Sequence, residues 1–235
     1  MNVLVLDVGG SHVKMLAAGA AKRRKSASGP ELTPGQLVET TKAQTDDWDF
    51  QAVSIGFPGP VLHGSIIAEP HNLGRGWVGF DFGAALGVPV KIVNDAAMQA
   101  LGGYRGGKML FIGLGTGLGT ALVIDSIVEP MEIGHLPYRK KTYEAYVGQR
   151  ALERAGRKKW RRHVLDVIEL LRAALEPDEI LVGGGNAKRL ENLPAYCRLG
   201  SNKDAFAGGF RLWDEGNTAT VDASDGHGNR LCSSG

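Results

Sequence analysis

Short apolar runs alternate with glycine-rich or polar segments along the chain and predict alternating strands and helices. The runs at 3–6 and 109–112 have the length of a buried strand, and each is followed by a glycine-rich turn and a second apolar run. We expect further strands at 13–18, 52–57, 88–93, 120–124 and 179–182, and helices at 33–45, 82–86, 95–102, 142–154, 159–175 and 187–193. This alternation is typical of an α/β fold.

Because the strand, glycine turn and strand occur twice, the pattern predicts two similar α/β halves. We place a smaller N-terminal domain at 1–105 and a larger C-terminal domain at 106–213. Residues 19–34 are small and basic and contain glycine and proline, so we expect a mobile loop or a ragged hairpin there. Residues 214–235 have almost no large apolar side chains and are predicted to be a disordered tail.

The two glycine-rich turns are candidate phosphate sites. Glycine has no Cβ, so several backbone N–H groups can approach one anion. Two such turns on two similar halves predict a phosphate chain held from both sides of a cleft, and therefore phosphoryl transfer. The candidate phosphate ligands are Gly9, Gly10, Ser11 and Lys14 in the first turn and Gly115, Thr116, Gly117 and Gly119 in the second.

Two aspartates follow apolar runs at the positions where such a cleft would form. Asp7 ends the first strand, where a carboxylate can hold Mg²⁺ against phosphoryl oxygens or can cap backbone N–H groups of the turn. Asp95 follows the strand at 88–93. There an acid can face the ligand crevice as a general base for a sugar hydroxyl, or Asn94 and Asp95 can act as a helix N-cap.

Three other segments each have two interpretations. Glu132 and His135 can bind sugar hydroxyls or a metal, or be structural. Trp77 can form the wall of a sugar site or fill a gap in the core. Gly184 and Gly185, before a predicted helix, can admit a purine or a phosphate, or form a tight turn.

Composition narrows the class of partner only a little. The chain has 235 residues and a formal net charge of +2, so its overall charge requires neither a nucleic acid nor a membrane. Basic residues gather at 22–25, 139–141 and 154–162, as a solvated surface or as a track for a polyanion. Two cysteines, no signal-like N-terminus and no apolar run of transmembrane length lead us to expect a cytoplasmic protein without a membrane partner.

Taken together, the motifs resemble those of the ROK family of sugar kinases and repressors, within the actin-like ATPase superfamily. The resemblance covers residues 3–213. It rests on seven segments in the family's order: Asp7-Val8-Gly9-Gly10-Ser11, Ile55-Gly56-Phe57-Pro58-Gly59-Pro60, Asn72-Leu73 with Trp77, Asn94-Asp95-Ala96, Gly115-Thr116-Gly117-Leu118-Gly119, Glu132-Ile133-Gly134-His135 and Gly183-Gly184-Gly185.

The resemblance implies a duplicated ribonuclease-H-like, hexokinase-type fold that closes over a sugar and a nucleotide. It implies Asp95 as general base, with Asn72, Asn94, Glu132, His135, the later Glu144 and the segment containing Gly59 on the sugar side. The expected reaction moves a phosphoryl group from ATP or polyphosphate, with Mg²⁺, to a hexose hydroxyl, glucose first. A kinase for fructose or N-acetylmannosamine and a silent sugar sensor are the alternatives. We also expect a homodimer.

Three departures refine the resemblance. Many family members have a cysteine-rich zinc motif where this chain has Tyr138-Arg139-Lys140-Lys141, which is similar to the zinc-free branch that includes polyphosphate glucokinases. The chain starts at the phosphate strand, so we expect no DNA-binding module. The family's final helix returns to the first domain, and residues 214–235 are too polar to form it.

Overall fold

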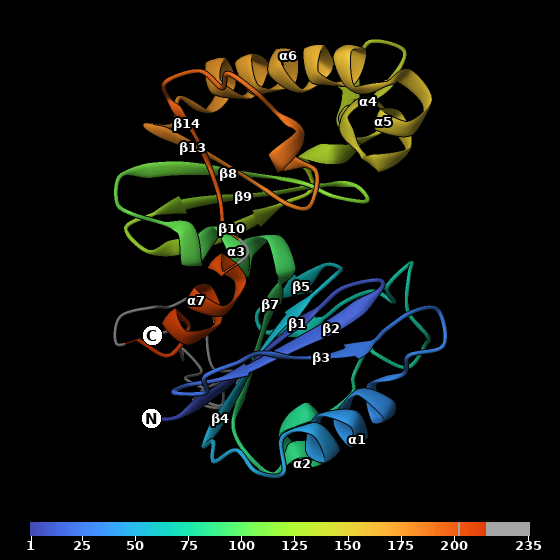
Figure 1. Ribbon diagram of the computed structural model, residues 1–235, viewed down its shortest axis with the longest axis vertical. Helices are drawn as coiled ribbons and strands as arrows, with labels where there is room; N and C mark the ends of the chain where they lie inside the picture. The colour runs from blue at the N-terminus through green and yellow to red at the C-terminus, as the bar shows by residue number, and fades with distance from the viewer. Residues whose placement is uncertain (202, 215–235) are drawn as a thin grey trace, which may run out of the picture.

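Two five-stranded sheets with the same strand order organise the computed structural model, which describes residues 1–201 and 203–214 (Figure 1). The first sheet has the order β3-β2-β1-β4-β7, and its strands are β1 (Val3–Val8), β2 (His12–Ala17), β3 (Arg24–Ala27), β4 (Ala52–Phe57) and β7 (Val90–Asn94). The second has the order β10-β9-β8-β13-β14, with β8 (Lys108–Leu114), β9 (Leu118–Ile124), β10 (Ile127–Met131), β13 (Glu179–Gly183) and β14 (Cys197–Leu199).

The strand directions repeat as well as the order. In the first sheet β2 runs antiparallel to its neighbours β1 and β3, whereas β4 and β7 run parallel to β1. In the second sheet β9 likewise runs antiparallel to β8 and β10, whereas β13 and β14 run parallel to β8. The predicted duplicated α/β fold of the ribonuclease-H-like, actin-like ATPase type is confirmed. The domain boundary near residue 105 stays a prediction.

Seven α-helices, two short hairpins and two 3₁₀ turns complete the described residues. The helices are α1 (Pro34–Gln44), α2 (Phe82–Leu86), α3 (Asp95–Gly103), α4 (Tyr143–Val147), α5 (Gln149–Ala155), α6 (Arg157–Leu175) and α7 (Asp204–Arg211). The hairpins are β5–β6 (Val61–Leu62, Ser65–Ile66) and β11–β12 (Pro137–Tyr138, Lys141–Thr142), and the turns are η1 (Ile133–His135) and η2 (Ala187–Arg189). None of the helices in this part of the chain has the length and apolarity needed to cross a bilayer.

Each sheet buries one face under its own helices. The helices α1 and α2 cover one face of the first sheet, and α6 lies along the outer face of the second (Figure 1). The helix predicted at 159–175 is confirmed as α6, and its apolar residues Val164, Val167, Ile168 and Leu171 are buried in the second core. These helices are stabilised mainly by burying one apolar stripe each, because intrinsic helix propensity contributes little by itself.

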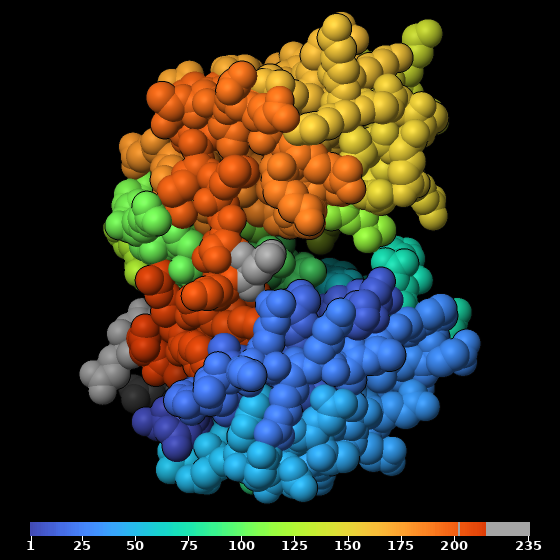
Figure 2. Space-filling view, in the orientation of Figure 1, coloured from blue at the N-terminus to red at the C-terminus, as the bar shows by residue number. Residues whose placement is uncertain are grey.

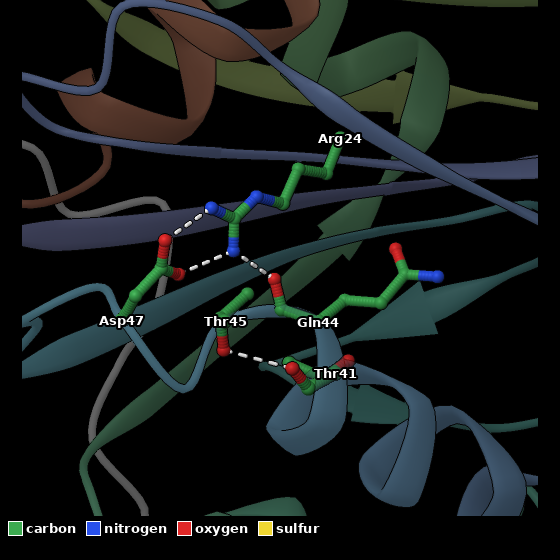
Figure 3. Close-up of polar contacts among 5 residues, drawn as sticks. All are labelled: Arg24, Thr41, Gln44, Thr45 and Asp47. Atoms are coloured by element: carbon green, nitrogen blue, oxygen red, sulfur yellow. Dashed lines mark hydrogen bonds and ion pairs between the residues drawn. The ribbon is translucent and has the colours of Figure 1, made fainter.

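The predicted loop or ragged hairpin at 19–34 contains a regular edge strand, β3, paired with β2. Arg24 in β3 lies 4.2 Å from the ring centroid of Trp48 and donates hydrogen bonds to both carboxylate oxygens of Asp47 and to the carbonyl of Gln44 (Figure 3). Thr45 Oγ1 donates to the carbonyl of Thr41 at 2.8 Å beside this contact. These bonds fasten the edge strand to the end of α1.

Two predictions at the C-terminal end need correction or fall outside the structure. The helix expected at 187–193 is wrong, because only the single 3₁₀ turn η2 forms before Leu190 packs into the second core. The disordered tail predicted at 214–235 lies outside the described residues except for Asp214. The returning helix that residues 214–235 were expected to lack is present earlier in the chain, as α7.

The helix α7 packs on β1 and β4 of the first sheet and crosses α3 at very close range. A Cβ on Gly208 would lie 1.8 Å from the carbonyl oxygen of Met98, and one on Gly102 would lie 1.8 Å from that of Asp204. Residues 204–213, expected in the C-terminal domain, therefore lie on the first sheet. Because α3 also packs on β8 and β9, the pair α3–α7 joins the two halves.

Ser54, Gly209 and Trp213 close the end of this contact with buried hydrogen bonds. Ser54 Oγ donates to the carbonyl of Gly209 at 2.6 Å, and Trp213 Nε1 donates to Ser54 Oγ at 2.8 Å. A buried polar group that loses such a partner is costly, so these bonds fix the position of α7 along the sheet.

We predict that Gly208→Ala destabilises the protein by about 3 kcal/mol, the upper end of the usual cost of overpacking, because the new methyl meets a backbone oxygen that cannot move aside. Urea unfolding measures the effect. The matched control is Gly35→Ala in α1, where no atom lies within 4 Å of the new Cβ. There we expect unchanged or slightly higher stability. Equal effects at the two glycines would contradict the close contact.

Candidate active site

The site lies between the two halves, where Figure 2 shows a hollow on the side away from α7. The turn after β1, the start of α3 and the turn between β8 and β9 meet there. A Cβ on Gly10 would lie 3.1 Å from Cβ of Asn72, and one on Gly119 would lie 2.9 Å from Cβ of Ala96. The first turn therefore adjoins Asn72, and the second adjoins the N-terminus of α3.

The first turn is held rigidly while its backbone stays accessible. Gly9 N–H donates to the carbonyl of His12 at 3.0 Å, and Ser28 Oγ donates to the carbonyl of Gly9 at 2.6 Å. Gly10 and Ser11 at its tip are exposed. A fixed turn with free N–H groups loses little entropy when it binds an anion.

Asp7 and Lys14 face each other directly across the β1–β2 pair. Lys14 Nζ lies 2.7 Å from Oδ2 of Asp7, which is only 7% exposed. A buried carboxylate needs a partner to stay charged, and this lysine supplies it. The carboxylate of Asp7 is thus held in an ion pair with Lys14, and its role as a metal ligand stays a prediction.

The structure separates the two functions that the sequence left open for Asn94 and Asp95. Asn94 Oδ1 accepts from the backbone N–H groups of Ala96 and Ala97 at 2.9 and 3.2 Å, so Asn94 is the N-cap of α3. Its Nδ2 donates to the carbonyl of Gly59 at 3.1 Å and links the helix to the predicted sugar segment. The carboxylate of Asp95 is therefore not needed as the cap.

Asp95 has the chemistry of a base that works near neutral pH. Burial, together with the negative charges of Asp7 and Glu132, raises its pKa to about 7, while the N–H of Ala96 and the charge of Lys14 act in the opposite direction. A pKa near the working pH is what general base catalysis requires. Because the pKa is raised in the folded state, the fold loses stability as the pH rises through about 7.

Glu132 directly precedes η1 and His135 is its last residue, just after β10 on the second half. Their side chains are largely exposed, with His135 Nε2 3.6 Å from Oε2 of Glu132. Gly134 between them is buried, and a Cβ there would lie 3.1 Å from the carbonyl oxygen of Leu118. The glycine thus lets this segment pack on the second turn. The negative charge of Glu132 is close enough to raise the pKa of Asp95.

Glu144 lies on α4 against the second glycine turn. Its Oε2 accepts from the N–H of Leu118 at 3.2 Å and occupies space that a Cβ on Gly117 would need, at 2.2 Å. The structure therefore brings Glu144 to the same turn as Gly134. Its assignment as a sugar ligand stays a prediction.

The segment Gly184–Gly185 forms the wall beside the second turn. Gly184 has φ +82°, and a Cβ there would lie 2.4 Å from the carbonyl oxygen of Leu114. Asn186 and Gln149, which the sequence analysis missed, join the Gly184–Gly185 segment to the second glycine turn. Asn186 Nδ2 donates to Oε1 of Gln149 at 2.7 Å and to the carbonyl of Gly115 at 3.3 Å. The only signal in the sequence is that Asn186 follows three glycines.

Trp77 belongs to the core and does not line the site. It is 0% exposed and packs on Phe57 and Phe82, with ring centroids 5.2 and 6.1 Å away. The structure thus favours the second of its two interpretations. Asn72, in the same loop, is exposed beside Gly10.

The hairpin β11–β12 connects η1 to α4 and is anchored on α6 through Tyr138. The hydroxyl of Tyr138 donates to Oδ2 of Asp166 at 2.5 Å and lies 3.1 Å from Nδ1 of His163. Its ring stacks on Tyr143 at 5.3 Å. Glu132, His135 and Glu144 are carried on the two sides of this one anchored hairpin.

Fold and site together define a phosphotransferase of the actin-like ATPase fold that acts on a sugar hydroxyl. The chain belongs to the ROK family, whose model matches residues 3–180.

Three comparisons with known proteins agree with this membership. The polyphosphate glucokinase of Mycobacterium tuberculosis is 27% identical over 208 residues, covering 79% of this chain and 78% of that protein. The structure of an inorganic polyphosphate/ATP-glucomannokinase from Arthrobacter sp. strain KM superposes with a TM-score of 0.75 at 24% identity, covering 88% of this chain and 96% of that one. The structure of a ROK family glucokinase from Streptomyces griseus in complex with glucose and AMPPNP superposes with a TM-score of 0.73 at 18% identity, covering 90% of this chain and 99% of that one.

We predict opposite shifts of the Asp95 pKa when its two charged neighbours are removed. Asp7→Asn should lower the pKa of Asp95, because a negative neighbour is lost, and Lys14→Met should raise it, because a positive one is lost. Carbon-detected NMR titration of the labelled carboxylate measures both. Shifts of the same sign would contradict the arrangement of charges described here.

Proposed function

We propose that this protein transfers a phosphoryl group from ATP or inorganic polyphosphate to a hexose hydroxyl, with glucose 6-phosphate as the first product to test. The observation that carries the proposal is Asp95, a carboxylate with a pKa of about 7 at the start of α3, between two glycine-rich turns. The polyphosphate glucokinase and glucokinase relatives support the choice of sugar and of donors.

Asp95 is the general base of the proposed reaction. As the sugar oxygen attacks the terminal phosphorus, Asp95 accepts the hydroxyl proton, and the bond from that phosphorus to the rest of the donor breaks. The products are a sugar phosphate and a donor shorter by one phosphoryl group. The N–H groups of the exposed turns stabilise the charge that develops on the transferred group.

The sugar lies on the side of Asp95 where polar groups from both halves meet. Gly59, Asn72 and Asn94 belong to the first half, and Glu132, His135 and Glu144 to the second. Because the two sets sit on different sheets, closing the halves brings both onto one sugar and excludes water from the donor.

The donor phosphates lie along the two glycine turns. In the first turn they meet Gly9, Gly10, Ser11 and Lys14; in the second, Gly115, Thr116, Gly117 and Gly119, with Gly184 and Gly185 beside them. Gly115 and Gly185 have no neighbour within 4 Å of a built Cβ, so their backbone is open to a ligand.

The residues around Asp7 fit Mg²⁺. Asp7 is a buried carboxylate, paired with Lys14 and with Asp95 nearby, and Mg²⁺ takes one or two carboxylates together with substrate phosphates and water. Asp7 would hold the ion. When bound, the ion neutralises charge on the transferred phosphoryl group.

A coupled assay with Mg²⁺ and glucose, supplied separately with ATP and with polyphosphate, tests the proposal. Fructose and N-acetylmannosamine serve as competing acceptors. No turnover with any acceptor would contradict the kinase and favour a sugar sensor.

Asp95→Asn should lower kcat by about 10³-fold, within the usual range for loss of a general base. In the unmodified enzyme, kcat/KM should fall about tenfold per pH unit below the pKa of about 7 and level off above it, because the base acts when ionised. The control Asp49→Asn makes the same replacement of a carboxylate by an amide at an exposed position and should keep full activity. A flat pH profile would contradict the assignment.

We predict that Tyr138→Phe raises the KM for the sugar up to about tenfold, corresponding to the loss of one net hydrogen bond, and leaves the KM for the donor unchanged. The change removes the bond from Tyr138 to Asp166 and leaves only Arg139 to hold the hairpin to that carboxylate, while the aromatic stacking is kept. Tyr143→Phe, which keeps the same stack, is the control. Equal changes in both KM values would mean that Tyr138 only stabilises the fold.

A further inference from the structure

Exposed cations follow α5 and α6 outward from the second glycine turn. We call this surface the cationic track, and it consists of Arg139, Lys141, Arg150, Arg154, Lys159 and Arg162. The chain as a whole has a formal net charge of only +2, so any attraction for a polyanion has to come from a local cluster of cations such as this one.

The inner end of the track touches the donor site. The helix α5 begins against the second turn, with the N–H of Gln149 3.1 Å from the carbonyl oxygen of Gly115 and 3.2 Å from that of Thr116. Arg150 is the next residue, and Arg154 lies one helical turn further out on the same side. Arg154 is fixed by donating to the carbonyl of Ala145 at 3.0 Å.

Two adjoining cavities carry the track onto α6. A cavity of about 220 Å³ is lined by Lys141, Arg154 and Lys159, among others. A second, of about 430 Å³, is lined by Lys159, Arg162 and Arg139. Both are also lined by Lys159 and His163, so the two cavities are neighbours and the cations form one continuous row.

Most of this charge is not compensated within the protein. In the part of the chain that the structure describes, Lys141, Arg150, Lys159 and Arg162 form no ion pair, while Arg139 pairs with Asp166 at 3.1 Å. In the larger cavity the two carboxylates Asp166 and Glu169 stand against three cations. The lining given for the smaller cavity holds three cations and no carboxylate. The surface therefore presents a net positive potential.

We propose that the cationic track binds inorganic polyphosphate and holds the part of the polymer that extends beyond the donor site. The proposal rests on the proposed function, because it takes the second turn as the place of the reacting end. A linear polymer with repeated negative charges suits a row of cations, and each contact adds to affinity. ATP ends within the cleft and has no phosphate left for the track.

The aromatic side chains favour polyphosphate over single-stranded nucleic acid. Sites for single strands stack bases on accessible aromatic rings. On this face Tyr138 is buried, and Tyr146 and His163 pack against it and against each other, with centroids 4.9–5.9 Å apart. The rings that line the track are therefore engaged mainly with one another, and the track offers far more charge than stacking surface.

Direct binding tests the proposal without requiring turnover. Fluorescently labelled long-chain polyphosphate is titrated with the full-length protein at several salt concentrations, for the wild type and for Lys159→Glu/Arg162→Glu. We expect at least a tenfold loss of affinity. The slope of log affinity against log salt should also become shallower, by the amount that corresponds to about one to two lost phosphate contacts. The control Lys22→Glu/Lys42→Glu makes the same change of charge on the first half, where both lysines are exposed, and should bind as the wild type does.

Kinetics give the second readout. In the track variant the ratio of the KM for long-chain polyphosphate to that for tripolyphosphate should rise about tenfold, because only the long polymer reaches Lys159 and Arg162. If no donor phosphorylates any sugar, the proposed function fails while the binding result still stands. Unchanged binding in the track variant overturns the proposal, and so does single-stranded DNA competing as well as polyphosphate at equal charge.

Discussion

The contact between α3 and α7 is the constraint on which the rest of the molecule depends. Two helices can approach until a carbonyl oxygen on one touches a glycine on the other only where both lack a side chain, as at Gly102 and Gly208. The short distance places α3 on both sheets at once, and the N-terminus of α3 carries Asn94 and Asp95 into the cleft. The position of the reactive carboxylate is therefore set by a packing contact at the opposite end of its helix.

Electrostatics in the cleft follow from that placement. Two carboxylates from different strand ends, Asp7 and Asp95, are brought close enough to repel each other, and the one lysine beside them, Lys14, forms its ion pair with Asp7. The pair therefore divides its functions, with one group charged and one poised to exchange a proton. The same surroundings that raise the pKa of Asp95, the proposed base, also make its ionisation cost stability, a common trade-off between activity and stability.

The sequence was informative wherever local signals and tertiary packing agree. The strand at 52–57 and the helices at 33–45 and 159–175, which form β4, α1 and α6, were all predicted from pattern alone. The helix α7 was missed because Gly208 and Gly209 weaken helix propensity, and only the neighbour that requires them explains their presence. The predicted helix at 187–193 failed for the opposite reason, because Leu190 is drawn into the core. Asn186 and Gln149 escaped notice since their partnership spans 37 residues.

The return of α7 to the first sheet has a consequence for how the chain matures. The core shared by Val3, Val5 and Ala52 with Phe206 and Leu212 joins the two ends of the described chain, so the second half is in effect an insertion into the first. During synthesis the strands of the first sheet emerge early, yet one of their apolar faces stays uncovered until residues 204–212 leave the ribosome. The first half therefore completes its folding last, although domains that emerge first usually fold first.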